Sequence, residues 1–196
     1  MDNGRIVRPR TARQIERLAA DARSALGLSQ DGRISMQPLL EQVLYEILEG
    51  YDFRVCDDKD MAQMEGLTDD REPIIYLKAS TYHALERGDG RARMTAAHEF
   101  GHLLMHCGAP TFRAFSEVYE PLCDPERQAN IFAAAFLMPA EAFKRCRTVN
   151  EAMRRFGVSR DAATLRARKL NHSFEPGRSI LTTVKKKKET SKRRSP

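Results

Sequence analysis

Residues 98–102 read His98-Glu-Phe-Gly-His102, and no other segment of the chain carries a clearer chemical pattern. On a helix, residues four apart lie one turn apart on the same face, so both imidazoles can reach one metal ion. Glu99, between them, is placed to act on a water at that metal. The pattern therefore predicts a zinc site of the kind that hydrolyses peptide bonds. The alternative is a helix whose histidines only cap or pack.

A zinc site with two histidines needs a third protein ligand and leaves the fourth position for water. One class of zinc peptidases would place a further histidine at position 108, but this chain has Gly108 there, and with Pro110 it indicates the end of the helix. His106 lies one turn beyond His102 and is rotated by about 40° from the zinc pair. We expect His106 beside the site, in a supporting or substrate-facing role, or simply packed or solvated.

A carboxylate on the following helix is the other source of a third ligand. Asp124 and Pro125 are a typical helix start, an N-cap followed by a proline in the first turn. Glu126 then falls in that first turn, from which its carboxylate can project. The apolar, alanine-rich run 131–138 predicts a buried helix that packs closely against the His98 helix and carries Glu126 to the zinc. The alternative that Glu126 only complements the helix dipole is left open. The alternative ligands are Glu117, Glu120 and Asp124.

Three segments in fixed order carry a family resemblance: residues 91–102, residues 126–139 and Phe156-Gly-Val-Ser159. In these segments the chain resembles the ImmA/IrrE family of zinc metallopeptidases. The resemblance implies a zincin-like fold, zinc as cofactor, and a cytosolic endopeptidase that cleaves a helix-turn-helix transcriptional repressor. Carried over by position, it implies His98, His102 and Glu126 as zinc ligands and Glu99 as general base.

The remaining pattern predicts an α+β fold, with N-terminal helices, a small antiparallel sheet, the helix bearing the metal motif and a C-terminal helical unit. Apolar spacing predicts helices over 11–26 and about 38–48, and alternation predicts a strand over 51–56. Residues 65–78 read as a hairpin around a polar turn. Extended substrates of such peptidases pair with a sheet edge, and Ile74 to Lys78 is the candidate edge.

Residues 148–170 read as two helices joined by a tight turn, with Ser159 as the second N-cap. The pair is either a DNA-reading helix-turn-helix or a helix pair packed on the larger domain. We therefore predict a metallopeptidase domain over 1–147, a helix-turn-helix-like unit over 148–173 packed on it, and a basic, disordered tail over 174–196.

The net charge of +6 is the sum of two regions of opposite charge and a short N-terminal segment. Residues 18–143 hold 11 basic and 21 acidic side chains, a balance of −10, whereas residues 144–196 hold 17 basic and 4 acidic ones, a balance of +13. The basic end predicts either weak, non-specific nucleic-acid contact or a solvated tail.

The 196-residue chain, at 41% hydrophobic content, is long enough to bury a sizeable core. Its N-terminus lacks an apolar secretory segment and its longest apolar run, 131–138, is too short to span a bilayer, so we expect a cytoplasmic protein without a membrane partner. The four cysteines form no C-x-x-C pair and are expected to be reduced thiols.

The mechanism predicted from these residues is metal-assisted peptide hydrolysis. Zinc would lower the pKa of its bound water toward about 7 and polarise the scissile carbonyl, and Glu99 would carry the water's proton to the leaving amine. The candidates for a further oxyanion donor are His106, Tyr76, Tyr82, His83 and Arg93. The competing class is a non-catalytic zinc-containing regulator or toxin-like module that binds a repressor or DNA. Only the enzyme requires Glu99.

Overall fold

The computed structural model describes residues 7–109 and 120–175. Its N-terminal half opens with α1 (Ala12–Ala25), followed by a continuous helical stretch made of α2 (Met36–Pro38), the π-helical turn η1 (Leu39–Val43) and α3 (Leu44–Ile47). Thr11 caps α1 in a capping box with Gln14, which fixes the start of this helix. Both predicted N-terminal helices are therefore present, the second beginning two residues earlier than expected.

The sheet and the helices that follow it come next in the chain. They are β1 (Asp52–Cys56), α4 (Asp58–Met61), β2 (Gly66–Thr68), β3 (Ile74–Lys78), α5 (Ala79–Glu86) and the long helix α6 (Gly90–His106). The C-terminal half is helical, with α7 (Glu120–Cys123), α8 (Pro125–Leu137), α9 (Ala140–Lys144), α10 (Val149–Phe156) and α11 (Arg160–Lys169). The expected α+β class is confirmed.

The three strands lie in the order β1-β3-β2. The expected hairpin is present, since β2 pairs antiparallel with β3, but β1 pairs parallel with β3, so the sheet is mixed rather than antiparallel throughout. The prediction that Ile74 to Lys78 forms the edge was wrong. This strand is central, and its side chains Ile74, Ile75 and Leu77 are buried accordingly. The strand edge next to α6 is β2.

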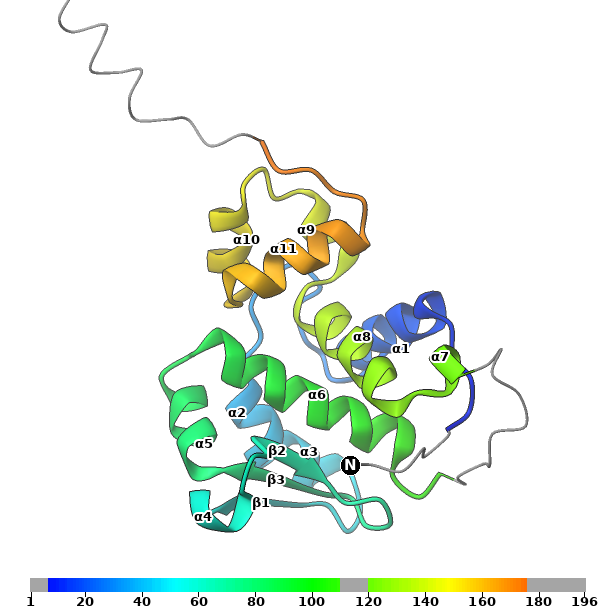
Figure 1. The fold of residues 1–196 in the computed structure, drawn as a ribbon, viewed down its shortest axis with the longest axis vertical. Helices are drawn as coiled ribbons and strands as arrows, with labels where there is room; N and C mark the ends of the chain where they lie inside the picture. Colours follow the sequence, from blue (N-terminus) through cyan, green and yellow to red (C-terminus); the bar gives the residue numbers. More distant parts are fainter. Residues whose placement is uncertain (1–6, 110–119, 176–196) are drawn as a thin grey trace, which may run out of the picture.

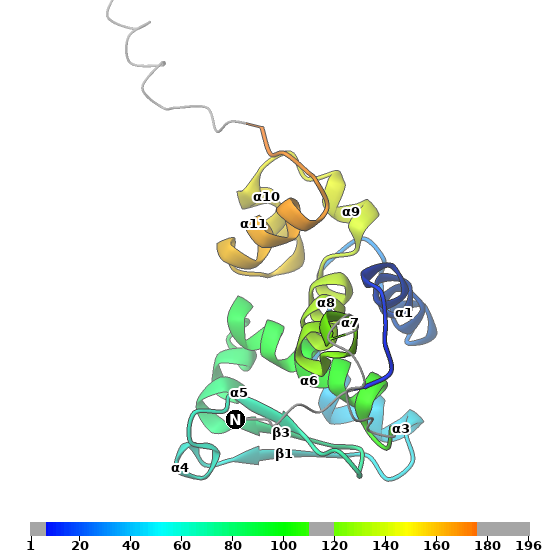
Figure 2. The same ribbon diagram turned by 45° about the vertical axis from the view of Figure 1, so that its right-hand side comes forward.

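Helix α6 runs through the middle of the molecule, with the sheet on one side and α8 and α1 on the other (Figures 1 and 2). Phe100 of α6 packs edge-on against Phe132 and Phe136 of α8, at centroid distances of 5.7 and 5.2 Å. At Gly101 the two helices approach so closely that an added Cβ would lie 3.0 Å from a ring carbon of Phe132. This contact brings the start of α8 next to the metal motif on α6.

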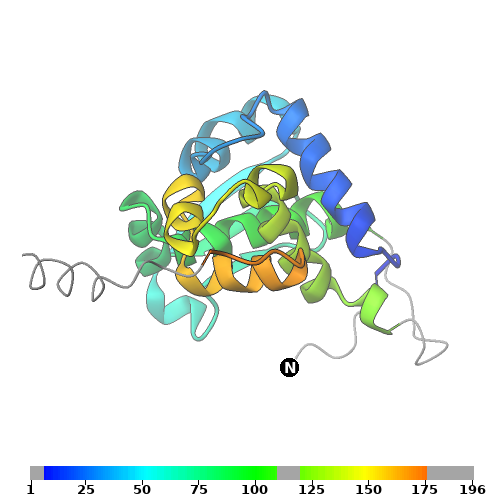
Figure 3. The ribbon, with the colours of Figure 1, turned by 90° about the horizontal axis from the view of Figure 1, so that it is seen from above.

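The C-terminal helices α9 to α11 pack above α6 and α8 (Figures 1 and 3). As predicted, Ser159 caps α11, and Gly157 supplies the left-handed turn before it, with φ of 63°. Arg93 of α6 is buried and donates hydrogen bonds to the carbonyl oxygens of Gly157, Phe156 and Ile34. This burial lowers the pKa of Arg93 to about 10. One guanidinium thus ties three segments together.

Among residues 7–109 and 120–175, no helix has both the length and the apolar character needed to cross a membrane. The thiols of Cys123 and Cys146 are buried, and those of Cys56 and Cys107 are partly exposed.

Candidate metal centre and cleft

Three side chains from two helices converge on one point. His98 and His102 lie one turn apart on α6, with their Nε2 atoms 3.0 Å apart. Glu126, in the first turn of α8, places Oε2 3.2 Å from His98 Nε2 and Oε1 3.2 Å from His102 Nε2. All these donor atoms lie within 4.8 Å of one another, a spacing that one metal ion can bridge.

The start of α8 determines which acidic residue reaches this point. The Asp124 side chain accepts hydrogen bonds from the backbone N–H groups of Glu126 and Arg127, at 2.9 and 3.2 Å, and therefore serves as the N-cap. Glu126 is left to project toward the histidines. Of the other alternative ligands, Glu117 and the side chain of Glu120 lie outside the described residues.

Glu99 lies beside the three convergent residues and is 6% exposed. The hydroxyl of Thr68, on strand β2, lies 2.8 Å from Glu99 Oε2 and 2.9 Å from the Glu99 carbonyl oxygen. Gly66, also on β2, leaves room for the carboxylate, because an added Cβ would lie 2.7 Å from Glu99 Cγ. The edge strand therefore fixes the position of Glu99.

The surroundings shift the pKa values of the Glu99 and Glu126 carboxylates in opposite directions. Burial raises the pKa of Glu99 above its ordinary value, although His98, His102 and the Thr68 hydroxyl act in the opposite direction. Hydrogen bonds to His102 and His98 hold the pKa of Glu126 far below its usual range. Burial disfavours the charged form of His98, but its interactions with Glu126 and Glu99 prevail and raise its pKa.

Each histidine also has a partner for its second ring nitrogen. His98 Nδ1 lies 3.2 Å from Asn130 Oδ1, and His102 Nδ1 lies 3.1 Å from His106 Nδ1. His106 Nε2 in turn lies 3.1 Å from Gln128 Oε1. His106 is thus buried beside the site. The sequence reasoning missed Gln128 and Asn130, although both follow Glu126 within about one turn of the same helix.

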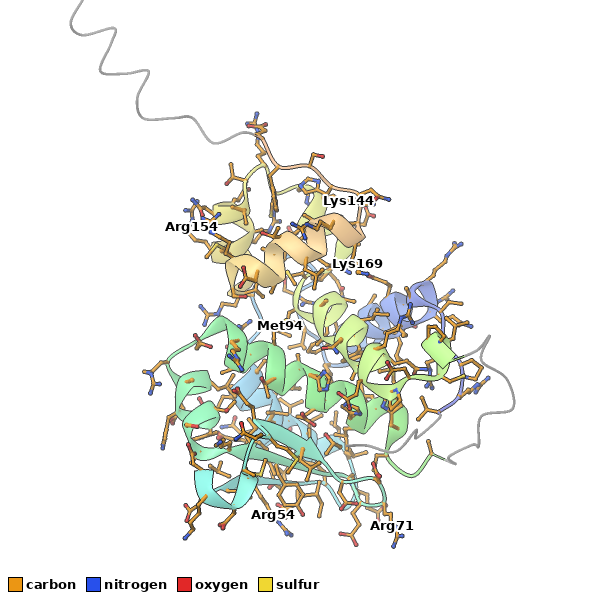
Figure 4. All side chains as sticks on the ribbon, viewed as in Figure 1. Arg54, Arg71, Met94, Lys144, Arg154 and Lys169 are labelled. Carbon is orange, nitrogen blue, oxygen red and sulfur yellow. The ribbon has the colours of Figure 1, made fainter. Side chains whose placement is uncertain are left out.

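A cleft of about 980 Å³ opens onto the convergent residues. It lies between strand β2 with the turn after it, the exposed face of α6 and the start of α8. Its walls include Met64, Glu65, Gly66, Leu67, Thr68, Arg71, Arg91, Met94, Thr95 and Asn130. The labelled side chains of Met94 and Arg71 mark its α6 and turn sides in Figure 4.

The five predicted oxyanion donors are not among the described residues that line this cleft. Arg93 is buried against backbone carbonyls, and Tyr82 donates to Glu41. Tyr76 lies under Arg54 on the sheet, and His83 pairs with Glu86 at the surface of α5. The sequence could not choose among these candidates, because nothing in the local sequence tells which face of its element a lone tyrosine or histidine occupies.

Comparison with known proteins places this geometry in a family. Residues 51–168 match the Peptidase_M78 family, described as an IrrE N-terminal-like domain. The chain belongs to this peptidase family. The match includes all three convergent side chains, Glu99 and strand β2, and it confirms the family resemblance read from the sequence.

Among solved structures, a Mycobacterium tuberculosis transcriptional regulator has a similar fold, with a TM-score of 0.52 and 18% sequence identity. The similarity covers 78% of this chain but 46% of the regulator, so this chain spans less than half of that protein. No curated protein matches the sequence.

Proposed function

We propose that this protein is a zinc-dependent endopeptidase. The observation that carries the proposal is a buried carboxylate, Glu99, held beside a cluster of two imidazoles and one carboxylate at the floor of an open cleft. Two histidines and a glutamate are a donor set found in catalytic zinc sites, where three protein ligands leave one position open. His98, His102 and Glu126 fit that set in atom type and spacing.

When bound, zinc supplies a Lewis acid for the scissile carbonyl and an activated water. The chain's own residues supply the proton transfer. Glu99 accepts a proton at its carboxylate and returns it to the leaving amine, a role suited to a carboxyl whose pKa burial has raised. Thr68 and Gly66 hold that carboxylate in one position.

The cleft also suggests how a peptide binds. Strand β2 is the sheet edge that lines the cleft, so an extended substrate segment can pair with its main chain. Met64, Leu67 and Met94 offer apolar contacts to side chains of that segment. Membership of the family supports a helix-turn-helix transcriptional repressor as the substrate, and the regulator among the structural neighbours is in keeping with such a setting.

The test uses the full chain co-expressed with the helix-turn-helix repressor encoded nearest to its gene. The wild type should cut the repressor to a defined fragment, identified by mass spectrometry. Glu99→Gln keeps the side-chain shape and the zinc ligands but removes the base, so cleavage should fall by about 10² to 10⁴ while zinc content stays near one per chain. Glu141→Gln, which changes an exposed side chain on α9, is the control and should cut normally.

The competing class is a non-catalytic regulator. If wild type and Glu99→Gln relieve repression equally and leave the repressor whole, that class replaces the peptidase.

A second experiment tests the ligand set. Elemental analysis should show that Glu126→Ala has lost its zinc, because only two protein ligands remain. Asp124→Ala should cost about 0.5–2 kcal/mol of stability through the lost N-cap yet keep its zinc. Loss of zinc from Asp124→Ala or Glu120→Ala, with Glu126→Ala still loaded, would assign the third ligand elsewhere.

A further inference from the structure

A chain of hydrogen bonds leads from the backbone near the N-terminus to the imidazole of His102. Its first member is Gln128, whose Nε2 lies 2.9 Å from the Arg8 carbonyl oxygen and 2.6 Å from the Leu122 carbonyl oxygen. Carbonyl oxygens only accept hydrogen bonds, so the amide nitrogen must face them. The Oε1 atom of Gln128 is thereby directed at His106.

The direction of each later bond follows from this first one. Gln128 Oε1 only accepts, so His106 carries its proton on Nε2, 3.1 Å away. In the neutral ring, His106 Nδ1 is then an acceptor, and it faces His102 Nδ1 at 3.1 Å. His102 must donate from Nδ1. Its lone pair is left on Nε2, the atom that lies 3.2 Å from Glu126.

Burial protects these hydrogen bonds from exchange with water. Gln128 is 0% exposed and His106 is 2% exposed, so water does not compete for these bonds. His98 is oriented differently, by a single bond to Asn130, a residue exposed to solvent. Water can take the place of the exposed Asn130, whereas the burial of His106 keeps water from taking its place.

We propose that His106 and Gln128 are positioning residues that fix the tautomer of His102, so that its Nε2 lone pair is presented to the metal. This inference rests on the proposed zinc site. A partner of this kind typically changes metal affinity by about 10- to 100-fold when it is removed.

The first experiment measures zinc affinity of the full chain by competition with a chromophoric chelator. His106→Phe keeps a ring of similar size but removes both hydrogen bonds, and its zinc Kd should rise about 10- to 100-fold. His106→Gln offers one donor and one acceptor without the ring and should recover most of the affinity. Asn130→Ala, at the exposed partner, should change the Kd by much less.

The second experiment needs no variant and covers the case in which the buried substitutions prevent folding. In the zinc-loaded wild type, ¹⁵N NMR of the histidine rings should show His102 coordinated through Nε2, with a slowly exchanging proton on Nδ1. Coordination through His102 Nδ1, or a proton there that exchanges as fast as one exposed to solvent, would overturn the inference.

These outcomes separate the inference from the proposed function. If the wild type binds no zinc, both fail. If the wild type binds zinc and His106→Phe binds it equally well, only the positioning role is refuted. It is also refuted if His106→Gln binds zinc as poorly as His106→Phe, because restoring one donor and one acceptor would then not restore zinc binding.

Discussion

The position of the Glu99 side chain depends on Gly66, a residue that has no side chain of its own. Gly66 lies against the carboxylate from strand β2, and Thr68 bonds it from two residues further along. A carboxylate that transfers protons must be held close to its productive position, since a displacement of about 1 Å can cost about 100-fold in rate. The position of the proposed base is therefore set by a strand more than thirty residues away in sequence.

Gly66→Ala tests this dependence. Its Cβ would come within 2.7 Å of the Glu99 side chain and push it aside, so kcat should fall about 10- to 100-fold while zinc content stays unchanged. Gly32→Ala is the matched control, because its nearest neighbour lies 4.0 Å away. Full activity in Gly66→Ala would mean that Glu99 adjusts freely and that β2 does not position it.

The residues of the candidate site differ in how far the sequence alone predicted their convergence. His98, Glu99 and His102 were visible because helical periodicity links residues four apart on one chain segment. Glu126 was found through the capping signal of Asp124 and Pro125. Gly66, Thr68 and Gln128 act through contacts across the fold, and no local pattern marks such contacts.

Among the elements, helix α6 is held in place by contacts near its N-terminus and in its C-terminal half. Its N-terminal part is fixed by Arg93, which bonds three carbonyls from two other segments, and its C-terminal part packs on α8 at Gly101. His98 lies between these two anchors, and His102 directly follows the second. The orientation of the metal motif is thus a property of the packed core and not of the helix alone.

Arg93→Met should destabilise the fold by about 3 kcal/mol, because it leaves buried carbonyl oxygens without their charged donor. Urea denaturation followed by circular dichroism measures the change. Arg91→Met, two residues earlier on α6, removes only an exposed ion pair with Glu65 and should cost at most about 1 kcal/mol. Equal stability of the two variants would contradict the anchoring role of Arg93.

The sequence predicted the individual helices and strands better than it predicted how they pack and pair. Helix caps and apolar spacing placed α1, α8, α10 and α11, since these signals act within a few residues. The hairpin of β2 and β3 also followed from a local turn. The parallel pairing of β1 with β3 involves a crossover through α4 and β2, which periodicity does not encode. The consecutive isoleucines of β3 were the one available sign of a central strand.

At the scale of the whole molecule, charge is segregated. Lys144, Arg154 and Lys169 lie on the upper helical part, well away from the sheet (Figure 4). Residues 185–196 add seven basic side chains against one acidic one, and they lie outside the described residues. A basic surface of this kind binds polyanions through counterion release, which salt suppresses.

Removing residues 185–196 should therefore abolish most nucleic-acid affinity, flatten its dependence on salt and leave peptidase activity intact. Fluorescence anisotropy with unrelated duplexes at several salt concentrations measures both effects. A sequence-selective complex that resists salt and survives the truncation would show instead that α10 and α11 read DNA.

The bond between Gln128 and the Arg8 carbonyl joins residues 120 positions apart. Contacts of such long range form late in folding, because the entropy of closing a large loop opposes them. During synthesis the ribosome must release the chain beyond residue 128 before residues 8, 102, 106 and 126 can meet. Between the synthesis of residue 102 and that of residue 126, the growing polypeptide carries both histidines without the proposed third ligand, so the proposed metal site can form only after the start of α8 has been made.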